Sequence, residues 1–173
     1  MGIRRLNHAV LYVRETARTV AFYRDVLGFR VTAELPGGAG AFLLAPGSTN
    51  DHDLGVFAMG PGAGDSAAGR STVGLYHLAW EVETLADLAE HAERLSTAGA
   101  LVGASDHGTS KSLYAKDPDG LEFEVVWLVP AHLLTDADSW DPPRPRPLDI
   151  AREAARFGEL TPGLGVPATT AAG

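Results

Sequence analysis

The fold follows from the stretch Ile3-Arg4-Arg5-Leu6-Asn7-His8-Ala9-Val10-Leu11-Tyr12-Val13, which is rich in apolar and β-branched residues and predicts a strand. From Thr16 onward the apolar residues fall at helical spacing, at Ala17, Val20, Ala21 and Val26 or Leu27. Thr16 is a residue type that caps helices, and Gly28 stands where a helix commonly ends in the left-handed conformation. We therefore expect a strand followed by a helix over about Ala17 to Leu27.

Three short apolar runs follow this helix, at Phe29 to Leu35, Ala41 to Ala45 and Asp53 to Met59. Segments that contain proline and glycine separate these runs, which is typical of turns between strands. The first half of the chain is thus predicted to have the order strand, helix, strand, strand, strand (βαβββ).

The second half of the chain repeats this order. Gly74 to Val82 predicts a strand, and Thr84 with Asp87 forms a capping-box pattern at the start of a second helix. Three further strands are predicted at Leu101 to Ser105, Ser112 to Lys116 and Leu121 to Leu128.

The two halves also align at particular residues. His8 aligns with His77 at an offset of 69 residues, and Gly28 aligns with Gly99 at an offset of 71. These alignments predict an internal duplication. The predicted fold class is α+β, with two tandem βαβββ modules that form a curved, partly open mixed sheet around a metal site.

These patterns define the expected domain organisation. Residues 1–130 are predicted to form one domain, with modules at about 4–60 and 74–130 joined by a Gly-, Ala- and Ser-rich loop. Residues 131–173 are predicted to be a proline-rich extension, because proline disfavours both helix and sheet. Leu148 to Leu160 could add a short helix there, and the Ala-, Thr- and Gly-rich end is expected to be partly disordered.

Composition excludes several classes of function. The 173 residues include 45% apolar residues and carry a formal net charge of −8, which supports a real core and argues against a nucleic-acid partner. No stretch has the length of a membrane span, and Met1 to Arg18 lacks a signal-peptide pattern, so a cytoplasmic protein without membrane contact is expected. The absence of cysteine removes disulfides, thiolate metal ligands and cysteine nucleophiles.

Histidines and one glutamate carry the chemistry that remains. His8 and His77 occupy equivalent places in the first strand of each half, and Glu124 lies on the last strand. Glu122 and Glu124 share one face of that strand because side chains alternate. Two imidazoles and a carboxylate would form the facial triad that leaves open positions on Fe(II), although each of these residues, taken singly, is also compatible with a structural or surface role.

At this point the sequence resembles the vicinal oxygen chelate superfamily, which includes glyoxalases, bleomycin resistance proteins and extradiol dioxygenases. The resemblance rests on the duplicated βαβββ order and on three motifs: Leu6-Asn7-His8-Ala9-Val10, Phe22-Tyr23-Arg24-Asp25-Val26-Leu27-Gly28-Phe29 and Asp117-Pro118-Asp119-Gly120-Leu121-Glu122-Phe123-Glu124. It covers about residues 4 to 130.

The stretch from His107 to Glu124 is similar to the signature of type I extradiol dioxygenases. His107, an apolar residue followed by Tyr114, and Asp117-Pro118-Asp119-Gly120 fall at that signature's spacing, with Ser105 as its one departure. By resemblance, His8, His77 and Glu124 would bind Fe(II), with Mn(II) also suited to these ligands. The resemblance further implies His52 as the acid–base residue and His107 and Tyr114 as partners of the catechol oxygens. The expected reaction is ring cleavage of a catechol-type substrate with O2.

Two other kinds of function stay open at this stage. Glyoxalase- and epimerase-like isomerases normally use four protein ligands or paired carboxylates, and the first half offers only Asp53 at the edge of the corresponding strand. A metal-free protein that sequesters its ligand is the other alternative. The resemblance also implies a homodimer or higher homo-oligomer, which would complete the sheet or shield the pocket.

Overall fold

The computed structural model describes residues 2–3, 5–68, 71–139 and 144–164. The predictions for Met1, for the centre of the proline-rich segment at 140–143 and for the chain end at 165–173 lie outside these residues. Contacts divide the chain into two compact units. Unit 1 comprises residues 1–67 and 117–121, and unit 2 comprises residues 68–116 and 122–173.

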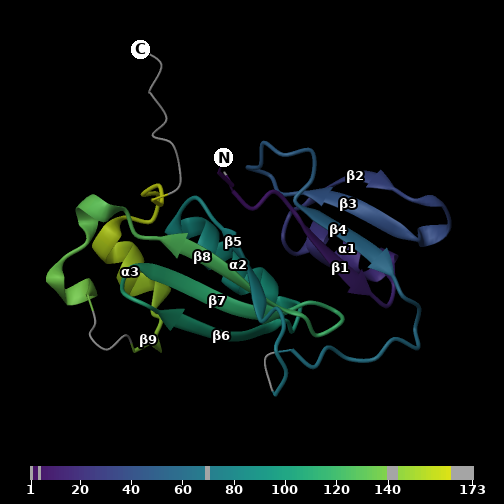
Figure 1. The fold of residues 1–173 in the computed structure, drawn as a ribbon. Helices are drawn as coiled ribbons and strands as arrows, with labels where there is room; N and C mark the ends of the chain where they lie inside the picture. The colour runs from purple at the N-terminus through teal and green to yellow at the C-terminus, as the bar shows by residue number, and fades with distance from the viewer. Residues whose placement is uncertain (1, 4, 69–70, 140–143, 165–173) are drawn as a thin grey trace, which may run out of the picture. The chain divides into compact units, whose positions relative to one another are not determined.

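Unit 1 is a four-stranded sheet with one helix on one face (Figure 1). Its strand order is β1-β4-β3-β2, with β1 parallel to β4 and the other pairs antiparallel. The elements are β1 (Ala9–Val13), α1 (Thr16–Asp25), β2 (Arg30–Glu34), the 3-10 turn η1 (Pro36–Gly38), β3 (Gly40–Leu44) and β4 (Leu54–Ala58).

Unit 2 repeats this arrangement. The elements are β5 (His77–Glu81), α2 (Leu85–Thr97), β6 (Leu101–Asp106), β7 (Ser110–Lys116) and β8 (Glu122–Leu128). Their order is β5-β8-β7-β6, with β5 parallel to β8, so each strand has a counterpart in unit 1. This topology confirms the predicted α+β fold with two βαβββ repeats.

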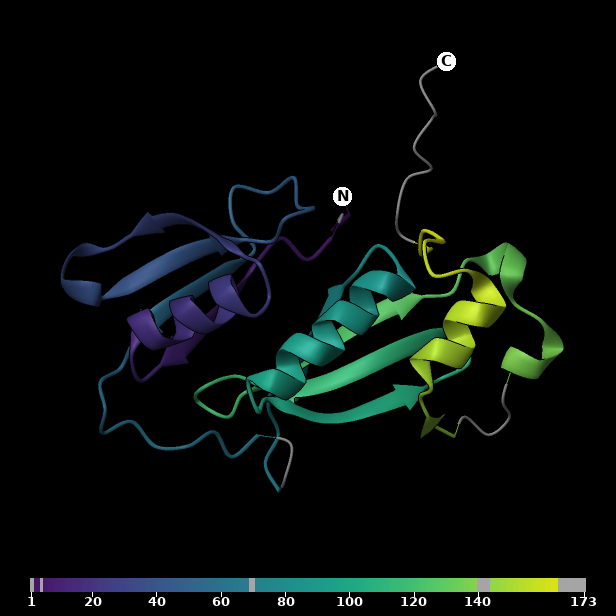
Figure 2. The same cartoon turned by 180° about the vertical axis from the view of Figure 1, so that it is seen from behind.

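The residues after β8 also have regular structure. They form η2 (Ala131–Leu133), η3 (Asp136–Asp138), β9 (Arg146–Pro147) and α3 (Ile150–Phe157). The short strand β9 adds to the edge of β6, and α3 lies beside α2 on the same face of the sheet (Figure 2). The helix predicted within Leu148 to Leu160 is therefore present, two residues shorter at its start and three residues shorter at its end.

Two details of the prediction were wrong in unit 1. The first strand begins at Ala9 rather than Ile3, because its partner strand begins at Leu54, which lies opposite Ala9. Thr16 does not cap α1: Glu15 is the extended N-cap residue, while Thr16 is already helical and its side chain is buried. In unit 2 the predicted capping box of Thr84 is confirmed, since its hydroxyl accepts the Asp87 N–H at 3.1 Å.

Each sheet has one face that is buried against helices and one face that the helices do not cover. On β8, Phe123 and Val125 are each 1% exposed, whereas Glu122 and Glu124 point to the other face as predicted. The buried face packs against the helices and supplies most of the core. The main core residues are Val13, Val20, Tyr23, Leu43, Leu54 and Val56 in unit 1, and Leu88, Leu95, Leu113, Phe123, Val125 and Trp127 in unit 2.

A membrane-crossing helix is not found among the helices that the described residues form, since none is both long and apolar enough.

The turn between β7 and β8 contains a buried carboxyl group. Asp117 is 5% exposed, and its Oδ1 accepts the backbone N–H groups of Asp119 and Leu121, each at 2.9 Å. Its buried Oδ2 has no hydrogen-bond partner. Burial raises the pKa of Asp117 to about 6, because desolvation disfavours the ionised form.

The raised pKa of Asp117 predicts a specific dependence of stability on pH. Because the pKa is higher in the folded state than its ordinary value near 4, the stability that this group contributes is complete below about pH 4 and is lost as the pH rises through about 6. Asp117→Asn removes this titration while keeping the Oδ1 acceptor. At pH 7 we expect the variant to match or exceed the wild type in unfolding free energy, by up to about 3 kcal/mol.

Urea unfolding across pH 4 to 7 measures this effect. Glu90→Gln is the control, since it changes the same charge at an exposed position on α2. Parallel stability profiles for the wild type and Asp117→Asn would contradict the prediction.

Candidate metal centre

A histidine and a glutamate meet on the open face of unit 2. β5 and β8 pair in parallel with Ala79 opposite Glu124, and His77 lies two residues before Ala79 on the same face. The register therefore brings His77 Nε2 to 3.2 Å from Glu124 Oε2. Their side chains are only 25% and 13% exposed.

This pair has the geometry of two metal ligands. Two ligand atoms at about 2.1 Å from an ion, on adjacent octahedral positions, lie about 3 Å apart. The observed separation of 3.2 Å fits this value. The second ring nitrogen of His77, Nδ1, is buried and has no hydrogen-bond partner, so no other hydrogen bond fixes the ring. His77 and Glu124 thus fit two positions of a divalent metal site.

Tyr114 and His107 extend the same cluster. Tyr114 on β7 lies directly opposite Glu124 in the antiparallel pairing of β7 with β8. Its hydroxyl is 2.9 Å from Nε2 of His107, which follows β6, and its ring centroid is 5.9 Å from that of His77. One face of one sheet therefore holds four of the six predicted site residues.

The environment of Tyr114 favours its protonated form. Burial, followed by the charge of Glu124, raises the pKa of the Tyr114 phenol above its usual value. The phenol is a neutral hydrogen-bonding group at neutral pH.

The remaining two predicted residues meet in unit 1. His8 directly precedes β1 and His52 lies two residues before β4, and these strands are parallel neighbours. The centroids of the two imidazole rings are 4.5 Å apart. Phe42 on β3 contacts His52 with a centroid distance of 5.0 Å. Unit 1 thus presents two imidazoles beside an aromatic side chain.

Neighbouring side chains fix the ring nitrogens of both histidines. His8 Nδ1 is 2.7 Å from Asn7 Oδ1, and because an amide oxygen only accepts, Nδ1 donates and Nε2 keeps its lone pair. His52 Nδ1 likewise lies 3.0 Å from Asp51 Oδ2. This hydrogen bond from His52 holds the pKa of the Asp51 carboxyl below its usual value. In both rings Nε2 is the nitrogen left for other partners.

The three predicted metal ligands come from both units of the chain. His8 belongs to unit 1, while His77 and Glu124 belong to unit 2. Within the part of the chain that the structure describes, no group of three or more His, Asp or Glu side chains is close enough to hold a metal ion. The structure shows two of the six predicted site residues together in unit 1 and the other four together in unit 2.

The strand register also shows which residue of unit 1 corresponds to Glu124. Val10 lies opposite Gly55 as Ala79 lies opposite Glu124, and both members of the first pair precede those of the second by 69 residues. Glycine thus stands where the second repeat has its carboxylate.

Asp53, the other acidic residue near that position, is committed elsewhere. Its Oδ2 accepts the backbone N–H of Ala45 at 2.9 Å, and its Oδ1 accepts from Ser48 Oγ at 2.8 Å and Asn50 Nδ2 at 2.6 Å. These bonds close the turn before β4. The first repeat therefore supplies no carboxylate equivalent to Glu124.

Sequence reasoning missed three residues that touch the site. Tyr76 directly precedes His77, and their ring centroids are 4.8 Å apart. A hydrogen bond to Glu122 raises the pKa of the Tyr76 phenol. Asn7 and Asp51, which orient the two histidines of unit 1, were also missed. Each of the three stands next to a predicted histidine in the sequence, and that adjacency was the available signal.

The fold and these residues agree with the comparison with known proteins. The chain belongs to the Glyoxalase/Bleomycin resistance protein/Dioxygenase superfamily, which it matches over residues 5–125. A solved glyoxylase/bleomycin resistance protein/dioxygenase domain from Frankia sp. EAN1pec shares the fold with a TM-score of 0.64 at 23% identity, over 76% of this chain and 96% of that chain.

Two curated proteins are similar in sequence. Biphenyl-2,3-diol 1,2-dioxygenase 3 of Rhodococcus globerulus is 36% identical over 122 residues, which are 70% of this chain and 62% of that protein. Catechol-2,3-dioxygenase of Bacillus subtilis (strain 168) is 32% identical over 120 residues, 69% of this chain and 40% of that protein. The chain thus spans less than two thirds of the length of either relative.

The closeness of Tyr114 to Glu124 predicts a measurable change in the pKa of Tyr114 when Glu124 is replaced. Because the carboxylate charge contributes to the raised pKa of Tyr114, Glu124→Gln is expected to lower that pKa in the metal-free protein. Burial persists in the variant, so the pKa stays above its usual value. Ultraviolet titration of the phenol, with Tyr114→Phe subtracted to isolate its signal, makes the measurement. An unchanged or higher pKa in Glu124→Gln would contradict the contact.

Proposed function

We propose that this protein is an Fe(II)-dependent extradiol dioxygenase that cleaves a catechol-type aromatic with O2. The observation that carries the proposal is the cluster of His77, Glu124, Tyr114 and His107 on one face of unit 2. In this proposal His8 completes the metal ligands with His77 and Glu124. The similarity to two proteins named as dioxygenases, at 36% and 32% identity, supports the same assignment.

The ligand number suits this chemistry. Three protein ligands on one face of an octahedral ion leave three positions, two for the catechol oxygens and one for O2. Bound Fe(II) would supply the path for electrons from the catechol to O2, and Mn(II) suits the same ligands. Glycine at position 55 and the committed carboxylate of Asp53 argue against a symmetric four-ligand site of the glyoxalase kind.

Tyr114 and His107 are proposed to bind the substrate oxygens. When His107 donates its Nε2–H to the Tyr114 hydroxyl, 2.9 Å away, the phenol proton is free to bond a catechol oxygen. This donor would orient the substrate and favour its ionised form. Tyr114 would hydrogen-bond a catechol oxygen that binds the metal, and His107 would support that hydrogen bond.

His52 is proposed as the acid–base residue. Its Nδ1 is held by Asp51, so Nε2 is the nitrogen that takes up and returns a proton. His52 lies beside the proposed ligand His8, with 4.5 Å between ring centroids.

The proposal takes residues 1–130 as the dioxygenase domain and residues 131–173 as an extension. It retains the homodimer or higher homo-oligomer as its assembly, which size-exclusion chromatography with light scattering measures.

Oxygen uptake is the direct test of the proposed reaction. After anaerobic loading with Fe(II), the protein is expected to consume one O2 for each molecule of substrate and to form a yellow product. The substrates are catechol, 3,4-dihydroxyphenylacetate, 3,4-dihydroxyphenylalanine and 2,3-dihydroxybiphenyl. Bound metal without oxygen uptake on any of them would contradict the proposal and favour an isomerase or lyase.

Substitutions separate metal binding from proton transfer. His8→Ala and Glu124→Ala are each expected to abolish metal binding and turnover, because each removes one of three ligands. His52→Phe is expected to keep the metal and lose about 10²- to 10⁴-fold in rate, the range for an acid–base group. Metal content by emission spectroscopy and oxygen uptake measure both effects.

Glu122→Ala is the matched control for Glu124→Ala, since it removes a carboxylate from the same face of β8 two residues away. It is expected to keep the metal. An active His8→Ala protein would overturn the ligand assignment.

A further inference from the structure

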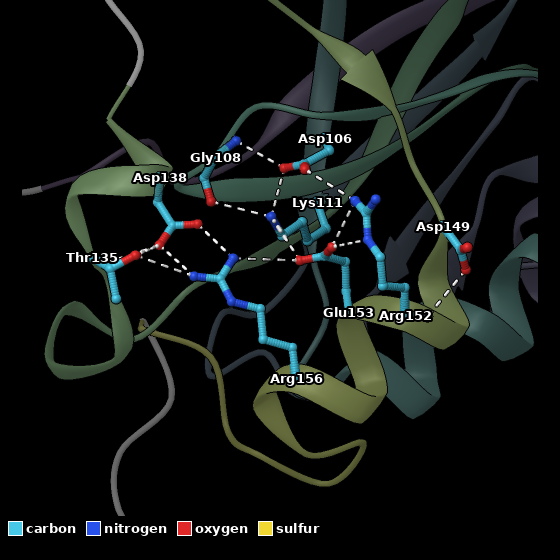
Figure 3. Close-up of polar contacts among 9 residues, drawn as sticks. All are labelled: Asp106, Gly108, Lys111, Thr135, Asp138, Asp149, Arg152, Glu153 and Arg156. Carbon is cyan, nitrogen blue, oxygen red and sulfur yellow. Dashed lines mark hydrogen bonds and ion pairs between the residues drawn. The ribbon is translucent and has the colours of Figure 1, made fainter.

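A buried ion cluster lies next to the loop that carries His107. The loop consists of His107, Gly108 and Thr109 and connects β6 to β7. We use the name Lys111 cluster for the charged side chains that Figure 3 shows in contact around Lys111: Asp106, Lys111, Asp138, Arg152, Glu153 and Arg156. Three of them are acidic and three are basic, so their charges balance.

Lys111 is the centre of this cluster. Its side chain is fully buried, with 0% exposure. The ammonium group lies 2.5 Å from Asp106 Oδ1 and 3.1 Å from Glu153 Oε2, and it donates to the carbonyl oxygen of Gly108 at 3.2 Å. Asp106 and Gly108 accept hydrogen bonds from the ammonium group, whereas Glu153 is its ion-pair partner.

Gly108 is bound by the cluster through both of its backbone groups. Its carbonyl accepts from Lys111, and its N–H donates to Asp106 Oδ1 at 2.8 Å. Its φ of +79° is one that side chains disfavour, so glycine suits this turn. Because Gly108 directly follows His107, the position of the His107 backbone depends on Lys111 and Asp106.

The helix α3 closes the cluster. Glu153 is 2% exposed, and besides Lys111 it contacts Arg152, whose Nε donates to its Oε1 at 3.0 Å. Arg156 donates to both carboxylate oxygens of Asp138, each at 2.6 Å, which ties α3 to η3. This pairing holds the pKa of Asp138 well below its usual range. The helix therefore presents Glu153 to Lys111 from a fixed position.

Neither Glu153 nor α3 lies within residues 5–125, the part of the chain that matches the superfamily. Removing charged groups from water carries a large desolvation cost that their mutual attraction must offset, so such a cluster is weak evidence for stability. What it does provide is a defined geometry, since each charged atom must keep its partners. Two hydrogen bonds of the cluster reach Gly108, the residue that directly follows His107.

We propose that Lys111 and Glu153 are positioning residues that hold the loop 107–109, so that His107 Nε2 meets the hydroxyl of Tyr114. The effect on turnover rests on the proposed function, in which His107 and Tyr114 contact the catechol. The hydrogen bond itself does not depend on that function. A measurement of the hydrogen bond between His107 and Tyr114 therefore tests the positioning role separately from the proposed function.

The test uses a double substitution with a matched control. Lys111→Met/Glu153→Met removes the ammonium group and the carboxylate of α3 together, which keeps the net charge and leaves no unpaired carboxylate on the helix. Glu90→Met/Arg94→Met removes an exposed ion pair with an N–O distance of 2.6 Å on α2. Thermal unfolding followed by circular dichroism establishes that each variant folds.

The structural readout is the nitrogen spectrum of the histidine side chains in the metal-free full chain. In the wild type and in the control, adding Tyr114→Phe is expected to shift the signal of His107 Nε2, because it removes its hydrogen-bond partner. In Lys111→Met/Glu153→Met the added Tyr114→Phe is expected to leave that signal unchanged. If the double variant does not fold, the same comparison is made with Glu153→Gln, where a reduced shift is expected.

Turnover gives the second readout. In Lys111→Met/Glu153→Met, kcat is expected to fall about ten- to a hundredfold while one metal per chain is retained, the loss typical of a group displaced by about 1 Å. The control is expected to keep its kcat within about twofold, because it removes only an exposed ion pair.

A folded cluster variant in which Tyr114→Phe shifts His107 as in the wild type would overturn the proposal. A full-sized shift in Glu153→Gln would overturn it equally where the double variant does not fold. A wild-type protein that consumes no catechol would overturn the proposed function instead, and the nitrogen spectra would still decide the role of the cluster.

Discussion

The parallel pairing of the first and last strand in each repeat is the constraint on which the site depends. β1 pairs with β4 and β5 pairs with β8, each with a fixed register. A parallel pair needs a long crossover, so residues more than forty positions apart become neighbours. His8 meets His52 in this way, and His77 meets Glu124. A pair of strands joined by a short hairpin would not bring either pair of side chains together.

Because the two repeats have the same strand register, residues at equivalent positions can be compared directly. Gly55 occupies the position that Glu124 holds in the second repeat. The space beside Gly55 is lined by the Phe42 ring and a methyl group of Val10, each 3.5 Å from where a Cβ would lie. The first repeat therefore presents two imidazoles near apolar groups, while the second presents a carboxylate, two imidazoles and a phenol. The two repeats therefore share a backbone register but differ in the ligand atoms that they offer.

The sequence predicted what is local and periodic. The alternation that turns Glu124 away from the core, the cap formed by Thr84 and the succession of strands and helices along the chain all depend on neighbouring residues. The burial of Lys111 could not be predicted in this way, because its partner Glu153 stands on a helix beyond the repeats. The alternation on β7 did contain a sign of it, since Lys111 shares its face with the buried Leu113 and Ala115. A lysine in that pattern requires a carboxylate from elsewhere in the chain.

The extension after β8 has a consequence for how the site is held. The repeats alone leave the loop 107–109 at one end of a hairpin, where the backbone bond from His107 N–H to the Ser110 carbonyl, 2.9 Å long, closes the turn. That hydrogen bond lies within the turn and does not connect the loop to any element outside the hairpin. Lys111 and Asp106 add two bonds to Gly108, and Glu153 holds Lys111 from a different element. Groups on three elements, β6, β7 and α3, then share in the proposed positioning of one imidazole, and a satisfied network of this kind can be worth more than the sum of its separate contacts. The extension thus acts on the site from the opposite face of the sheet, without contributing a ligand to it.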